Sequence, residues 1–433
     1  MSTLKLETYV PHAGVGKPRS KLGLVWDRMT KPAEEPPFRP LPEYHIRVLK
    51  IKPGTSEHPL RAKLKVVDPR KFKYIALSYT WQIDETDLAA PTHTILVGGT
   101  NVSIRQNLYD ALCQVRDSQS DVPIFADALC INFDDHEERT DHIEIMGHIY
   151  ARAASVIVWL GKKDRESDQI MLIMRKLVNA IDWRKTQRDS STDEYFRDPR
   201  FFQNLGIEPL TLKQWQQILD FCEMRWFTRY WSFFELALAK NALFLWGEAC
   251  MEYNFILDFG MILGLSRWLE NLPTLSGEES EVSTNALMKM LGPVSRLRST
   301  PAWHPRSNEY TSWMRDNFQL ETDQQRGWKF FEILLQSAEA LECTDQRDRI
   351  YAPLAYVRHV FGGKSMNKQW PRPEYSMPVG TVMSTFSNLI FQQTRQRSIL
   401  ATDFHVPQEY QQLRAASRDG SRGRTGRERR PFG

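Results

Sequence analysis

The chain has 433 residues, of which 41% are apolar and 25% charged, as is ordinary for a globular protein with two or three structural regions. Its formal net charge is +4. Residues 411–433 contain seven arginines against Asp419 and Glu428, a balance of +5, which leaves −1 for the rest. We therefore expect no nucleic-acid partner for the folded part.

The sequence also argues against a membrane protein and against a metal or disulfide scaffold. The best apolar run, 255–265, is too short for a span and is interrupted by Asp258. Residues 1–19 lack the pattern of a signal peptide. The five cysteines are scattered without a CxxC, and the histidines show no metal-binding spacing. We expect a cytoplasmic protein with no metal site and no membrane partner.

The first part of the chain predicts a leader followed by strands. Residues 1–41, rich in Pro, Lys and Glu, predict an extended leader. The alternating segments 44–51 and 60–67 predict an antiparallel pair with one solvent-exposed face. Residues 74–79 read as a strongly buried strand, and 94–104 as a hairpin around two glycines.

The stretch 122–161 predicts a strand, a helix and a second strand. Residues 122–126 and 156–160 are apolar without alternation, which is typical of strands covered on both faces. Between them, Asp134 and Asp135 provide N-cap chemistry for a helix with one apolar face. This is the pattern of a parallel sheet.

The alternation of strands and helices from 74 to 246 predicts an α/β fold, with a mainly parallel sheet and helices on both faces. One of these helices should begin near Thr211, and a further strand should span 243–246. Residues 251–410 predict a mostly helical region, and 411–433 a disordered Arg/Gly tail.

Three stretches resemble the signatures of the fungal heterokaryon-incompatibility (HET) domain family. They lie at 74–82, 123–161 and 225–240, and the resemblance places the domain at 42–250. The matching residues are Ala76, Leu77, Ser78, Tyr79, Trp81, Asp127, Ala128, Cys130, Ile131, Asn132, Glu138, Arg139, Met146, Ile149, Tyr150, Ala153, Trp159, Leu160, Gly161, Trp226, Phe227, Arg229, Trp231, Glu235 and Ala239. The departures from the family pattern are Gln82 for Gly, Phe125 for Trp, and Phe133 and Phe234 for Gln.

The resemblance implies an effector of fungal self/non-self recognition that triggers programmed cell death. HET domains are thought to be distantly similar to Toll/interleukin-1 receptor (TIR) domains, which implies a TIR-like or flavodoxin-like sheet. Some TIR domains hydrolyse NAD, so NAD is a candidate substrate, and no bound cofactor is expected. Many other TIR domains signal by self-association.

Side chains at the carboxyl ends of the strands are the first candidates for ligand binding. In a doubly wound sheet, ligands bind beyond these ends. Ser78, Tyr79, Trp81 and Asp127 would share one crevice there if their strands are neighbours. The structural alternative is that Asp127 caps a helix and that Tyr79 and Trp81 only pack.

Glu235 is the candidate catalytic residue. Trp231 and Glu235 have the W-x-x-x-E spacing of TIR enzymes, which puts the carboxylate one helical turn from the indole. Trp231 is therefore a further candidate for ligand binding, in an aromatic wall of the cleft. A carboxylate can stabilise the oxocarbenium-like centre formed when a glycosidic bond breaks. The alternative is that Glu235 forms a structural ion pair with Arg229 or Arg225.

The two phenylalanines leave the function open. Phe133 and Phe234 replace amides of the family pattern, so either the cleft is drier and inactive, or those amides were structural. We therefore consider three hypotheses for the function. They are a nucleotide hydrolase, a non-enzymatic module that self-associates, and a degenerate, inactive relative. The protein partner in recognition is not identified by the sequence.

Overall fold

The computed structural model describes residues 38, 41–81, 92–162, 165–182, 200–204, 206, 208–266, 286–299, 308–320, 322–362 and 370–394. The chain divides into Met1–Arg39 and Pro40–Gly433, and the following concerns the second unit. The predicted tail at 411–433 lies outside the described residues, as does the leader at 1–41 except for residues 38 and 41.

Nine strands of the described residues form one sheet, in the order β5-β4-β2-β1-β6-β3-β7-β8-β9. The strands are β1 (Ile46–Ile51), β2 (Arg61–Val67), β3 (Ile75–Tyr79), β4 (Thr92–Val97), β5 (Thr100–Arg105), β6 (Val122–Phe125), β7 (Ser155–Gly161), β8 (Ala242–Trp246) and β9 (Ala249–Glu252).

Four neighbouring strands of the sheet run parallel, and most pairs outside them are antiparallel, except for the parallel pair β2–β4. Strands β6, β3, β7 and β8 run parallel, as the apolar runs predicted. The antiparallel β1–β2 pair and the β4–β5 hairpin are also confirmed. The predicted solvent-exposed face is present on β2 but not on β1, which is buried on both faces. Strand β9 was not predicted, because its four residues lack a strand pattern. It follows a tight turn in which Gly247 adopts a φ of 55°.

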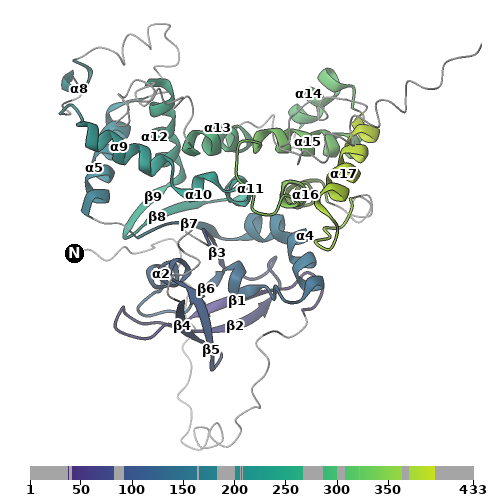
Figure 1. Ribbon diagram of the computed structural model, residues 1–433, viewed down its shortest axis with the longest axis horizontal. Coiled ribbons are helices and arrows are strands. Elements are labelled where there is room, and N and C mark those ends of the chain that lie inside the picture. The colour runs from purple at the N-terminus through teal and green to yellow at the C-terminus, as the bar shows by residue number, and fades with distance from the viewer. Residues whose placement is uncertain are drawn as a thin grey trace, which may run out of the picture. The chain divides into compact units, whose positions relative to one another are not determined.

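Helices cover both faces of the sheet, as predicted. In Figure 1, α2 (Gln106–Val115) lies on one side, and α10 (Arg225–Thr228) and α11 (Tyr230–Leu238) lie on the other. The alternation of side chains along β3 and β7 explains this division. Trp159 points to α2, where its indole donates to Asn107 at 2.8 Å, whereas Ser78 points to α11.

The crossover helices begin where their capping residues predict. In α4 (His136–Arg152), the Asp135 side chain accepts from the backbone N–H groups of Glu137 and Glu138. In α9 (Leu212–Cys222), Thr211 and Gln214 form a capping box. The other helices of this part are α3 (Asp127–Cys130), α5 (Arg165–Ala180) and α8 (Phe201–Asn204).

The region after the sheet is helical, as predicted. Its helices are α12 (Tyr253–Ser266), α13 (Ala286–Ser299), α14 (Asn308–Phe318), α15 (Asp323–Ser337), α16 (Asp348–Phe361) and α17 (Val379–Thr394). Helix α16 packs on α4 and α11, so the core continues from the sheet into this region. None of the described helices combines the length and hydrophobicity that crossing a membrane requires.

Candidate functional site

The carboxyl end of β3 meets the second half of α11 (Tyr230–Leu238) in a buried polar contact. The Ser78 hydroxyl donates to the Glu235 carboxylate. The same hydroxyl oxygen accepts from the indole nitrogen of Trp226 at 2.9 Å. Serine and glutamate are 157 residues apart in the chain, and the fold brings them together because β3 lies directly under α11.

Glu235 is held in an environment that favours its protonated form. Burial raises the pKa of its carboxyl group from 4.5 to about 7, and the charge of Asp127 contributes in the same direction. The positive charge of Arg229 and the hydrogen bond from Ser78 oppose this shift. The side chain is only 5% exposed. Near neutral pH, Glu235 therefore exists in both protonation states.

Asp127 is the more accessible of the two carboxylates. It is half-buried, and it accepts from the indole nitrogen of Trp81 at 3.0 Å and from the Ala128 backbone N–H at 2.8 Å. Burial raises the pKa of Asp127, while the charge of Arg229 lowers it. Trp81 is 39% exposed. Asp127 therefore accepts from the Ala128 N–H in the first turn of α3 and also makes a solvent-exposed contact with Trp81.

Tyr79 lies near Asp127, and Tyr150 lies near both carboxylates. Tyr79 is buried, and burial together with the nearby Asp127 charge raises the pKa of its phenol. The Tyr150 hydroxyl donates to the Leu77 carbonyl oxygen at 3.2 Å. The charges of Glu235 and Asp127 both raise the pKa of Tyr150, which burial raises most. Ser78, Tyr79, Trp81, Asp127 and Glu235 therefore form one cluster.

Arg229 is a member of this cluster with a role that the sequence did not indicate. Its guanidinium donates to the carbonyl oxygen of Tyr79, and it does not form the ion pair with Glu235 that was the structural alternative to a catalytic role. Arg225 is exposed. The hydrogen-bond partner of Glu235 is Ser78, and among the described residues Glu235 forms no ion pair with Arg229 or Arg225.

Trp231 lies apart from the cluster. It is half-buried, and its indole lies close enough to Asp348 to lower the pKa of that carboxyl group. The indole that shares a partner with Glu235 is that of Trp226, five residues before Trp231 in the chain. The W-x-x-x-E spacing therefore identified the helix and its carboxylate but not the neighbouring indole.

The two phenylalanines have different environments. Phe234 is 2% exposed and packs on Tyr356 of α16, with ring centroids 6.3 Å apart, so this position is part of the core. Phe133 is half-buried and meets Trp81 edge-on at 5.2 Å. Only Phe133 therefore lies in the wall of the candidate site.

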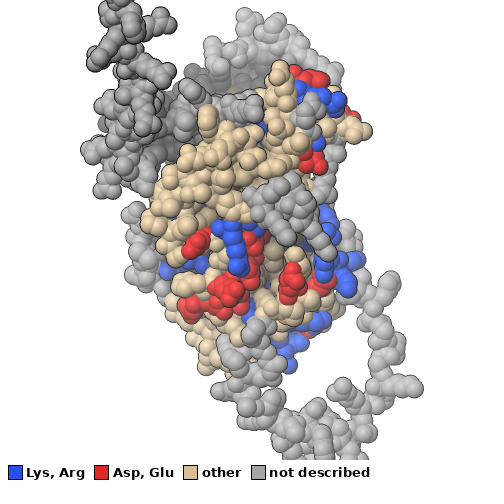
Figure 2. Space-filling model, turned by 90° about the vertical axis from the view of Figure 1, so that its right-hand side faces the viewer, with Lys and Arg blue, Asp and Glu red and all other residues tan. Residues whose placement is uncertain are grey.

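The chemistry of the site is that of carboxylates, hydroxyls, indoles and one guanidinium. No three His, Cys, Asp or Glu side chains converge as metal ligands within the described ranges. On the face drawn in Figure 2, acidic and basic side chains lie next to one another and form no broad patch of one sign. The absence of a nucleic-acid partner stays a prediction.

Part of the chain is similar to a known protein family. Residues 74–235 match the family model described as heterokaryon incompatibility protein (HET). The Neurospora crassa protein named heterokaryon incompatibility protein 6, OR allele, is 26% identical over 262 residues, which are 53% of this chain and 38% of that relative. No solved structure matches the chain, and the expected similarity to TIR domains stays a prediction. The matched segment begins at β3 and ends at Glu235.

Proposed function

Because residues 74–235 form a HET domain, we propose that this chain acts in heterokaryon incompatibility, as an effector that triggers programmed cell death. We further propose that the effector step is hydrolysis of the nicotinamide–ribose bond of NAD or of a related nucleotide in the cytoplasm. The observation that carries the proposal is the pair of carboxylates, Asp127 and Glu235, in one cluster at the carboxyl edge of the parallel strands.

The pair suits glycosidic cleavage because its two members differ in accessibility. Asp127 is half-buried beside the exposed ring of Trp81, where a nicotinamide or a ribose can approach. An ionised carboxylate at that place stabilises positive charge developing on the ribose. Glu235 lies behind it, and its pKa of about 7 allows it to hold or release a proton near neutral pH.

The test is nicotinamide release by the purified full chain at high protein concentration. We expect turnover by the wild type and a loss of about 100-fold or more in kcat for Asp127→Asn and Glu235→Gln. Asp121→Asn is the matched control, since Asp121 precedes the same strand β6 at its opposite end and pairs with Lys50 and Lys52. Absence of release from a folded wild type would refute the hydrolase proposal.

A non-enzymatic module that works by self-association is the second candidate. The observation that favours it is the burial of Glu235 and its hydrogen bond with Ser78, which a purely structural carboxylate would also show. On this hypothesis, folded Glu235→Gln still kills cells, and killing follows the oligomeric state measured by light scattering. A degenerate relative would show neither turnover nor killing.

A further inference from the structure

A second polar feature lies beside the carboxylate cluster and centres on Arg139. Arg139 is in the first turn of α4, and its guanidinium stands 3.8 Å from the ring centroid of Tyr375 and 6.0 Å from that of Phe133. Within the described part of the chain, its buried Nε has no hydrogen-bond partner, and its guanidinium forms no ion pair. The cation is thus held by aromatic faces rather than by a counter-ion.

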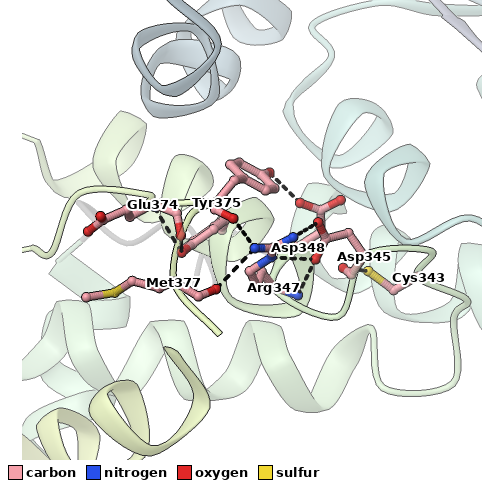
Figure 3. A network of polar contacts seen from close by, with 8 residues as sticks. Cys343, Asp345, Arg347, Asp348, Glu374, Tyr375 and Met377 are labelled. Carbon is pink, nitrogen blue, oxygen red and sulfur yellow. Dashed lines mark hydrogen bonds and ion pairs between the residues drawn. The ribbon is translucent and has the colours of Figure 1, made fainter. Parts of the chain in front are cut away.

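Two acidic groups that feel the charge of Arg139, Asp345 and Asp348, are engaged elsewhere. Both oxygens of Asp345 accept from the guanidinium of Arg347, at 2.9 and 2.8 Å. Asp348 accepts from the Tyr375 hydroxyl at 2.5 Å. Figure 3 shows Arg347 between Asp345 and the carbonyl oxygens of Tyr375 and Met377, with the Tyr375 hydroxyl directed at Asp348.

This network leaves the charge of Arg139 without a partner in contact. Asp345 is neutralised by Arg347, and burial raises the pKa of Asp348. The positive charge of Arg139 still lowers the pKa of both carboxyl groups, although Arg139 forms an ion pair with neither of them. A guanidinium in such a position is suited to an incoming anion, and its planar donors match a phosphate group.

An aromatic wall connects Arg139 to the proposed reaction site. Phe133 lies next to Arg139, Trp81 meets Phe133 edge-on at 5.2 Å, and Trp81 donates to Asp127 at 3.0 Å. A nucleotide that stacks along this wall can present its ribose to Asp127 and its phosphates to Arg139.

We propose that Arg139, supported by Tyr375, binds a phosphate group of the nucleotide whose glycosidic bond lies at Asp127. This rests on the proposed function and assigns the residue that recognises the nucleotide's phosphate, so a nucleoside, which lacks that phosphate, should be a poor ligand. Tyr375 lies outside the segment 74–235 that matches the HET family, so the helical region contributes to the site.

The test is calorimetric titration of the full chain with ADP-ribose, which carries the pyrophosphate but no nicotinamide bond. We expect Arg139→Gln to weaken ADP-ribose binding by about tenfold or more, as for loss of one charge-assisted hydrogen bond. The matched control is Arg152→Gln, an exposed arginine in the last turn of the same helix, which should bind like the wild type. Equal affinity in Arg139→Gln, or no binding of ADP-ribose to the wild type, overturns the proposal.

A second measurement needs no variant and covers the case in which Arg139→Gln does not fold. Inorganic pyrophosphate should displace ADP-ribose from the wild type, and failure to compete also overturns the proposal. The two proposals fail separately. Arg139-dependent ADP-ribose binding without nicotinamide release refutes hydrolysis alone. Nicotinamide release with an unchanged KM for NAD in Arg139→Gln refutes the phosphate site alone.

Discussion

The burial of Glu235 has an energetic consequence that depends on its protonation state. A protonated carboxyl group can be buried at modest cost, whereas a buried carboxylate loses hydration that one hydrogen bond does not replace. In Glu235 the hydrogen bond from Ser78 and the charge of Arg229 do not outweigh burial, so the pKa rises from 4.5 to about 7. The folded state therefore binds a proton more tightly than the unfolded state does.

We accordingly predict that Glu235→Gln changes the dependence of stability on pH. The stabilisation from proton binding is complete below about pH 4.5 and is lost as the pH rises to about 7. At pH 8 the wild type has lost nearly all of this stabilisation, about 3 kcal/mol, and the neutral amide avoids that loss. We expect the free energy of unfolding of Glu235→Gln, measured in denaturant relative to that of the wild type, to be higher at pH 8 than at pH 5.

The control for this prediction is Asp121→Asn. Lys50 and Lys52 lower the pKa of Asp121, so its contribution to stability is lost only in more acidic solution and is constant between pH 5 and 8. Asp127, whose pKa is also raised, adds a slope of the same sign, so Glu235→Gln should reduce the wild-type slope without abolishing it. An unchanged slope would contradict the assigned environment of Glu235.

At the scale of elements, the contact between α4 and α16 depends on a glycine. A Cβ atom at Gly147 would lie 2.3 Å from the carbonyl oxygen of Ala355, which is backbone and has little freedom to move. We predict that Gly147→Ala destabilises the protein by about 1–3 kcal/mol, although alanine favours a helix by roughly 1 kcal/mol. The free energy of unfolding in urea measures the effect.

Gly264 in α12 offers the matched comparison. A Cβ atom there would approach only the terminal methyl group of Met288, at 2.9 Å, and that flexible group can turn away. Gly264→Ala should therefore leave the stability unchanged or raise it by about 0.5–1 kcal/mol. If both variants behaved alike, the close approach of α4 and α16 would be wrong.

The elements that sequence patterns predicted are those whose signals are local. The helix cap at Asp135 and the apolar runs of β6 and β7 are each encoded by a few consecutive residues, and the structure confirms these elements. The partners of Glu235 and Trp231 were missed because Ser78 and Asp348 are more than a hundred residues distant in the chain. Such pairings depend on how the helical region packs on the sheet, which no local pattern encodes.

At the scale of the whole molecule, the helical region holds the start of α11 in place. The Tyr230 backbone N–H donates to the Glu342 carbonyl oxygen at 2.8 Å, and the Glu342 N–H donates to that of Thr228 at 2.6 Å. The Tyr230 hydroxyl donates to the Arg349 carbonyl oxygen at 3.0 Å. These bonds flank Arg229, so a cluster built on residues 74–235 is positioned by residues outside that segment.

We predict from this that residues 40–250 alone do not form the native site. Removing the helical region would expose Tyr230 and Phe234, each 2% exposed in the whole chain, and would leave backbone groups at 228 and 230 without their partners. Each buried aromatic ring contributes roughly 1.5–3 kcal/mol, against a total stability of about 5–15 kcal/mol for a typical domain. The isolated segment should therefore lack the near-ultraviolet circular dichroism and the cooperative unfolding of the full chain. A cooperative transition with the same aromatic signal would instead mean that the sheet and α11 fix the carboxylate cluster by themselves.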